Sequence, residues 1–215
     1  MENGNLLTKV TIGKARASYA HVFHPTSISP TDTNLKYSVT LIIPKSETGL
    51  IEKIRAAMKN AYTNGMQSKW GGKAPKKPYD PLKDGDAEKP DDEAYADSYY
   101  INASCKTKPG VNKVKGYATI DGKRKLQTEE ITDESEFYSG CYVYATVNFF
   151  AFDAGANKGV ACGLNNILKV EDGEPLGGRS SAESDFGDLS LPEEDMPFSP
   201  DNDPFGATAE DKCPY

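Results

Sequence analysis

The sequence predicts a mainly β fold, a small closed barrel of five or six strands with one α-helix, followed by a disordered acidic tail. Three observations predict it. Between residues 10 and 170 the apolar residues recur mostly with a period of two, which is the period of a half-buried strand. A single stretch in this region has helical spacing instead. The final 33 residues hold ten acidic residues against one lysine.

Five stretches show the alternation expected of strands. The strongest runs from Tyr142 to Phe152, where small or apolar residues alternate with polar or aromatic ones. Asp121-Gly122, between two further short runs, is typical of a type I′ β-hairpin. The other predicted strands are Val10 to Tyr19, Lys36 to Ile43, Tyr99 to Cys105 and Gly159 to Val170.

The predicted helix lies between the second and third of these strands. Apolar residues recur at helical spacing from Leu50 to Ala61, Ser46 can cap the start, and Gly65 suits the end. Five or six strands with one helix make the oligonucleotide-binding fold (OB-fold), a Greek-key barrel, the obvious candidate. The pattern alone does not separate this fold from other β-rich barrels.

The tail is predicted to form a separate part of the chain. It contains five prolines and neither valine nor isoleucine, so it cannot bury enough apolar surface to offset the entropy of ordering. We therefore predict an OB-fold domain over residues 1–182 and a disordered acidic tail over residues 183–215.

The charge of the chain is divided between these two parts. The net charge is −7, but the tail alone carries −9, which leaves residues 1–182 with 24 basic and 22 acidic groups, a balance of +2. No apolar stretch approaches the roughly 18 residues that span a bilayer, and the first residues lack the features of a signal peptide. We expect a protein of the bacterial host cytoplasm with no membrane partner.

Catalytic and metal-binding motifs are scarce. The sequence has no phosphate-binding glycine loop, no Gly-x-Ser-x-Gly elbow and no His-Glu-x-x-His motif. His21 and His24 lack a third metal ligand, and the four cysteines do not have the spacing of a metal site or a disulfide scaffold. We therefore expect neither enzymatic activity nor a cofactor or metal.

Clusters of cations with aromatic residues among them indicate single-stranded nucleic acid. Basic side chains neutralise phosphates, and aromatic faces stack unpaired bases in any sequence. The alternative for each residue is a solvated lysine or an aromatic ring of the core. The residues predicted to bind DNA are Lys69, Trp70, Lys73, Tyr100, Lys106, Lys108, Lys113, Lys115, Lys123, Arg124, Lys125 and Tyr144.

The tail contains a repeated acidic and aromatic pattern. Acidic runs precede Pro-Phe at Phe198 and again at Phe205. This pattern resembles the acidic tip of bacterial single-stranded-DNA-binding proteins, whose final Phe docks into partner enzymes. Here the chain ends at Tyr215 instead. Phe198, Phe205 and Tyr215 are the predicted contacts to replication or recombination proteins, with a DNA mimic and a solubilising appendage as the alternatives.

Distinctive motifs lie at residues 37–45, 69–72, 100–104, 138–141 with 147–151, 157–166 and 177–183. Together they resemble a phage family of single-stranded-DNA-binding proteins, first catalogued as a domain of unknown function. The resemblance covers roughly residues 8 to 186. It implies an OB-fold with an acidic tail, similar in plan to the T7-type replication protein, and sequence-independent binding of single-stranded DNA in phage DNA replication or recombination.

Two other functions compete with this prediction. A metal-dependent nuclease would use carboxylates of the loop at residues 80–97. A virion or scaffold protein would bind only protein and no DNA. The sequence leaves the oligomeric state open, with a homodimer as one option, and it leaves the choice between DNA and RNA open.

Overall fold

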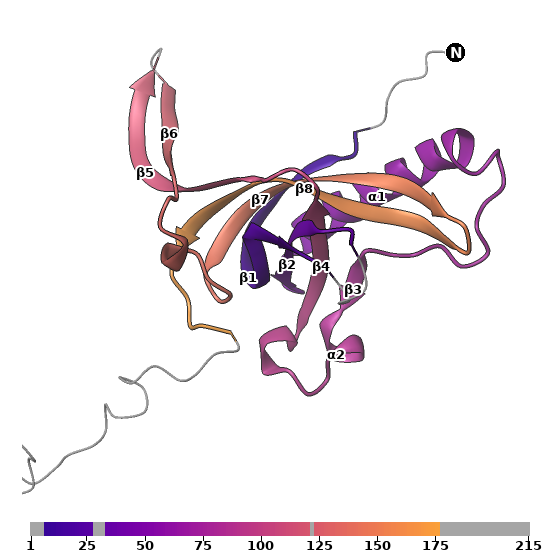
Figure 1. Ribbon diagram of the computed structural model, residues 1–215, viewed down its shortest axis with the longest axis horizontal. Coiled ribbons are helices and arrows are strands. Elements are labelled where there is room, and N and C mark those ends of the chain that lie inside the picture. The colour runs from indigo at the N-terminus through magenta and orange to yellow at the C-terminus, as the bar shows by residue number, and fades with distance from the viewer. Residues whose placement is uncertain (1–6, 28–32, 121–122, 177–215) are drawn as a thin grey trace, which may run out of the picture. The chain divides into compact units, whose positions relative to one another are not determined.

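The computed structural model describes residues 7–27, 33–120 and 123–176 (Figure 1). The predicted tail, with Phe198, Phe205 and Tyr215, lies outside the described residues.

Five strands close into a barrel. They are β1 (Lys9–Thr26), β2 (Lys36–Pro44), β4 (Ser98–Cys105), β7 (Tyr142–Ala154) and β8 (Asn157–Glu171). Antiparallel pairing joins β4 to β2, β2 to β1, β1 to β7 and β7 to β8. A parallel pairing of β4 with β8, at Ala103 and Cys162, closes the circle. The predicted mainly β barrel with one substantial helix is therefore confirmed.

Three short or peripheral strands extend this barrel. β3 (Leu82–Asp84) lies on the edge of β4 and is followed by the single-turn helix α2 (Gly85–Glu88). β5 (Gly110–Ile120) first runs parallel to β8 and then pairs with β6 (Lys123–Glu130). The predicted hairpin around residues 121–122 is thus part of a longer arm, which stands away from the barrel (Figure 1).

Alternation along the strands separates the core from the surface. On β7, Val143, Ala145, Val147 and Phe149 are buried inside the barrel. Tyr144, the residue between the first two, points to the outside. The predicted alternation of this strand is therefore confirmed.

The helix α1 (Thr48–Ser68) packs against β7 and β1 with its apolar face, including Ile54 and Ala61. Its start differs from the prediction because Glu47, not Ser46, occupies the N-cap position, without a side-chain cap bond. Its end also differs. Gly65 lies inside the helix, where a Cβ atom would be 2.2 Å from the Cβ of Ala151. This glycine therefore allows a close approach of α1 to β7 and does not end the helix.

An irregularity in β1 shapes its outer surface. The first half of β1 pairs with β7, and the second half pairs with β2 from Arg16 onward. The register with β2 shifts between Ser18 and His21, and Tyr19 has a positive φ of 45°. The amide of Ala20 donates a hydrogen bond to the Ser139 hydroxyl oxygen, 3.2 Å away, instead of extending the ladder. This β-bulge turns the Tyr19 side chain outward.

Candidate nucleic-acid interface

The outer face of β1, β2 and β4 carries uncharged polar groups. Ser18 pairs with Thr40, and Thr40 pairs with Asn102, so that the three residues form a line across the three strands. The Thr40 hydroxyl donates to Oδ1 of Asn102 at 2.7 Å. The next line joins His21 to Ser38 and Ser38 to Ser104. Ser18 and Thr40 are themselves almost fully buried, so Asn102 is the exposed polar group of the first line.

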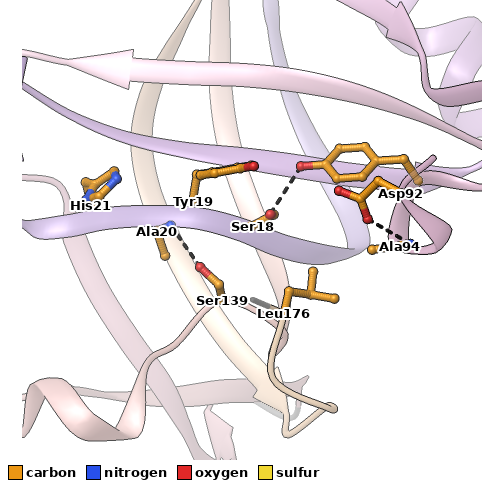
Figure 2. Close-up of a pocket in the computed structure, with 9 residues that line it drawn as sticks. Ser18, Tyr19, Ala20, His21, Asp92, Ala94, Ser139 and Leu176 are labelled. Atoms are coloured by element: carbon orange, nitrogen blue, oxygen red, sulfur yellow. Dashed lines mark hydrogen bonds between the residues drawn. The ribbon is translucent and has the colours of Figure 1, made fainter. Parts of the chain in front are cut away.

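Two cavities open on this face and share Tyr19 and His21. The first has a volume of about 400 Å³ and is lined by outward residues of β1, β2 and β4, among them Lys36, Thr40 and Asn102. The second has a volume of about 370 Å³ and lies between β1, the turn η1 (Glu93–Tyr95) and Leu176 (Figure 2). Both volumes fall in the range of ligand sites. We call this pair of cavities the groove.

Hydrogen bonds fix the second cavity (Figure 2). The Tyr95 hydroxyl donates to the Ser18 hydroxyl at 3.1 Å, and Asp92 accepts a bond from the amide of Ala94 at 3.2 Å. The amide of Leu176 donates to the carbonyl of Ser139 at 2.7 Å. Asp92 is the single carboxylate that lines this cavity.

A lysine lies among the aromatic rings at the groove. Nζ of Lys89 is 3.9 Å from the ring centroid of Tyr95, 4.7 Å from that of Tyr19 and 5.7 Å from that of Tyr100. Burial lowers the pKa of Lys89, but its hydrogen bond with Tyr95 and the surrounding negative groups outweigh that effect and raise it. Lys89 therefore keeps a positive charge beside the groove.

Two of the predicted stacking residues, Trp70 and Tyr100, are buried in the described structure. Trp70 is 7% exposed, packs against Tyr62, and donates its indole N–H to the carbonyl of Phe152 at 3.1 Å. Tyr100 is 8% exposed and packs with Ile42 and Tyr95 in a small second cluster on the outer face. Neither ring presents a free face to a base.

The predicted lysines around Trp70 lie away from the groove. Lys69 and Lys73 are exposed at the end of α1. Lys69 lines a different cavity, beside Asn148 and Phe150 of β7. The structure therefore does not bring these two cations together with the residues of β1, β2 and β4.

Lys106 and Lys108 lie close to the groove. Both are exposed directly after β4, whose last residue, Cys105, pairs with Tyr37 of β2. The neighbouring Lys36 lines the first cavity. These three lysines form the cationic end of the groove, and we use that name for them below.

The hairpin lysines differ in how far their charge is compensated. Lys113 forms an ion pair with Glu136 at 2.6 Å, which raises the pKa of the lysine, and Lys115 lies 3.9 Å from Glu129. Pairing of β5 with β6 brings Glu129 next to these lysines, and Glu136 comes from the turn η2 (Glu134–Glu136); both acids lie outside the basic stretch of the sequence. The three remaining predicted cations are exposed on β6: Lys123, Arg124 and Lys125.

Tyr144 is exposed, but on another side of the barrel. Its side chain is 42% exposed on the outer face of β7. It lines a cavity of about 400 Å³ together with Thr11, Asn112, Thr146 and Asn166. Exposed tyrosines therefore lie on several surfaces of the described structure. Tyr19 lies at the groove, Tyr144 on β7, Tyr79 before β3, and Tyr117 on the β5–β6 arm, where Arg124 lies 4.1 Å from its ring centroid.

The sequence prediction missed most residues of the groove. Ser38 and Thr40 alternate with buried residues of β2, and Asn102 and Ser104 do so on β4. This alternation was visible in the sequence, but the pairing that joins the two strands was not. Nothing in the sequence indicated that Tyr19 is exposed, because only the bulge turns its side chain outward.

The carboxylates of the loop at residues 80–97 are engaged in local contacts. Lys45 lies 2.8 Å from Asp84 and 2.6 Å from Asp86. The hydrogen bond from Lys45 lowers the pKa of Asp86. Within the described residues no three His, Cys, Asp or Glu side chains are grouped so as to hold a metal ion. None of the helices described there is long and apolar enough to cross a membrane.

Sequence comparison finds related phage proteins. The model of the family described as Enterobacter phage Enc34, ssDNA-binding protein, matches residues 8–197. Protein p50 of Acyrthosiphon pisum secondary endosymbiont phage 1 is 34% identical over 197 residues, which cover 87% of this chain and 97% of p50.

Solved structures of similar fold come from the same phage family. The single-stranded DNA-binding protein from bacteriophage Enc34 in complex with ssDNA is 25% identical, with a TM-score of 0.63 over 79% of this chain and 90% of that one. Another structure of the Enc34 protein is 26% identical, with a TM-score of 0.59 over 84% and 90% of the two chains. The family match extends over nearly all of the barrel, and the chain therefore belongs to the Enc34-type family of phage single-stranded-DNA-binding proteins.

Proposed function

We propose that this protein coats single-stranded DNA independently of sequence, and that the groove is where the strand binds. The observation that carries the proposal is the pair of joined cavities on the outer face of β1, β2 and β4, with an exposed tyrosine between them and three lysines at one end. In OB-folds this face of the second and third barrel strands is the usual oligonucleotide site. In this barrel those strands are β2 and β4.

The chemistry of the groove supports a lack of sequence preference. Its lining combines hydroxyl groups with a tyrosine ring, which stacks on any base, while the lysines contact phosphates. A similar protein, the Enc34 protein, has been solved with ssDNA. By analogy we place the present protein in phage DNA replication or recombination in the cytoplasm of the host bacterium.

A titration of the full chain tests this proposal. Fluorescence anisotropy of labelled oligo-dT, of single-stranded RNA and of duplex DNA of equal length measures the three affinities in one buffer. We expect tighter binding to single-stranded DNA than to duplex, and similar affinity for mixed single-stranded sequences. Absence of oligo-dT binding at low salt would contradict the proposal and favour a protein that binds only protein.

We further propose that the acidic tail competes with DNA for the groove. Leu176 lines the second cavity and packs on the cluster of Ile42, Tyr95 and Tyr100. The chain therefore continues toward the tail from the rim of the groove. Ten acids in that tail match the charge of a short nucleic-acid strand. A partner-docking arm that uses Phe198, Phe205 and Tyr215 remains the alternative role.

A further inference from the structure

We infer that Tyr19 is the principal base-stacking residue of the groove and that the β-bulge of β1 exists to present its ring. This inference rests on the proposed function and names the residue that carries it. The Tyr19 side chain is 58% exposed and contributes to both cavities. Lys89 lies over one face of the ring, so a base stacked on the other face would lie against the cavities of the barrel surface and not in open solvent.

The backbone of Tyr19 is strained. Its φ of 45° lies in the left-handed region, which a bulky residue rarely adopts because its Cβ crowds the backbone. Glycine adopts this conformation without that cost. Strain of this kind is concentrated at functional sites.

The bulge around Tyr19 is held by contacts outside the β1–β2 ladder. The register of β1 with β2 shifts between Ser18 and His21. On one side Ser18 accepts a hydrogen bond from Tyr95, and on the other Ala20 donates one to Ser139. Bulges next to binding sites redirect a side chain in this way. Figure 2 shows both hydrogen bonds beside Tyr19.

Lys89 places a positive charge next to the same ring. Its Nζ is 4.7 Å from the Tyr19 ring centroid and 3.9 Å from that of the buried Tyr95. A stacked base carries its phosphate within a few ångströms, so a ring and a cation in this arrangement fit one nucleotide of a single strand. The cavity beside Tyr144 on β7 is lined by uncharged residues. Tyr117 has Arg124 over its ring, but it lies on the β5–β6 arm and lines neither cavity of the groove.

Three substitutions of Tyr19 in the full chain test the inference. Tyr19→Ala and Tyr19→Gly are expected to weaken oligo-dT binding about 5- to 140-fold, which corresponds to 1 to 3 kcal/mol at 1.4 kcal/mol per tenfold. Tyr19→Phe keeps the ring and should bind like the wild type. The dependence of affinity on salt should be unchanged in all three, because no phosphate contact is removed.

Thermal unfolding separates this role from a structural one. Because glycine relieves the strain, Tyr19→Gly should unfold at or above the wild-type temperature while it loses affinity. Phe150→Ala is the matched control, because Phe150 is an aromatic residue that is 45% exposed but lies far from Tyr19. It lies on β7 eight residues from Tyr142, and Tyr142 pairs with Arg16 of β1. Eight extended residues span roughly 26 Å. This control should bind like the wild type.

The outcomes separate failure of the inference from failure of the proposed function. If the wild type binds oligo-dT and a folded Tyr19→Gly variant binds equally well, Tyr19 is not a stacking residue. A Tyr19→Gly variant that unfolds at a lower temperature would show that the tyrosine serves the fold, which also overturns the inference. If the wild type itself does not bind, the proposed function fails first.

Discussion

Gly65 sets the distance between α1 and β7. A Cβ atom at this position would lie 2.2 Å from the Cβ of Ala151 and 3.2 Å from the ring of Trp70. We expect Gly65→Ala to lower the free energy of unfolding by about 1 to 3 kcal/mol, because helix and strand must separate to admit the methyl group. Urea unfolding measures this change. The double variant Gly65→Ala, Ala151→Gly should recover part of the loss, and a wild-type midpoint for Gly65→Ala would contradict the packing described.

Tyr144 allows a test of whether DNA also contacts the outer face of β7. If DNA continues from the groove onto β7, Tyr144→Ala should weaken oligo-dT binding by about 1 to 3 kcal/mol with an unchanged salt dependence. Anisotropy titrations over a range of salt concentrations measure both quantities. Unchanged affinity, with intact circular dichroism, would confine the strand to the side of the barrel that carries Tyr19.

Single aromatic residues were the least predictable part of the site. Alternation along β4 places the Tyr100 side chain on the outer face of the barrel, which made it a candidate for base stacking. The outer face of β4 is itself covered there by Tyr95, so that both faces of the strand are buried. The turn that supplies this cover ends only five residues before Tyr100, but nothing in the sequence indicates that the Tyr95 ring packs back onto the strand. Burial of Trp70 against Tyr62 and Phe152 has the same kind of cause.

At the level of elements, the strands and the helix were predictable because each has its own periodicity. β2, β4 and β7 begin and end within two residues of the predicted limits. The pairing of strands was not predictable. The parallel contact of β4 with β8, for example, joins segments about 60 residues apart, and the sequence of neither strand indicates its partner. The groove depends on the pairing of β2 with β1 and with β4, which the sequence did not indicate either, and therefore its residues were missed.

The two groups of lysines around β4 and β5 should differ in their contribution to binding. Lys106 and Lys108 are exposed at the cationic end of the groove, whereas Lys113 and Lys115 lie beside Glu136 and Glu129. If about five or six phosphates are neutralised, log K should fall with log[salt] with a slope of roughly −4.

The double variant Lys106→Ala, Lys108→Ala should flatten that slope by about 1.4, because each phosphate contact contributes about 0.7 for a single strand. The matched double variant Lys113→Ala, Lys115→Ala should change it less, since these charges are already compensated. Titrations at several salt concentrations give both slopes. An equal effect of the two pairs would show that the hairpin lysines leave their acids to contact DNA.

At the level of the whole molecule, the division of charge is the feature that the sequence shows best. Residues 1–182 carry +2 and the tail carries −9, although the chain as a whole is acidic. A net charge of −7 would by itself argue against a nucleic-acid partner. Its distribution instead allows one part of the chain to bind DNA and the other part to compete with it.

Truncation after Ala182 tests this competition. A tethered tail meets the groove at an effective concentration of about millimolar for a short flexible linker, so even weak contacts would occupy the groove part of the time. We expect the truncated protein to bind oligo-dT more tightly, most clearly at low salt, where the attraction of the tail is least screened. Binding to duplex DNA should also increase, because the internal competitor is gone.

A full-length variant with the ten tail acids changed to amides is the matched control and should behave like the truncation, since it keeps the length and the aromatic residues but removes the charge. If both proteins bind like the wild type at every salt concentration, the tail is not a DNA mimic, and capture of replication proteins by the tail would then test its role as a docking arm.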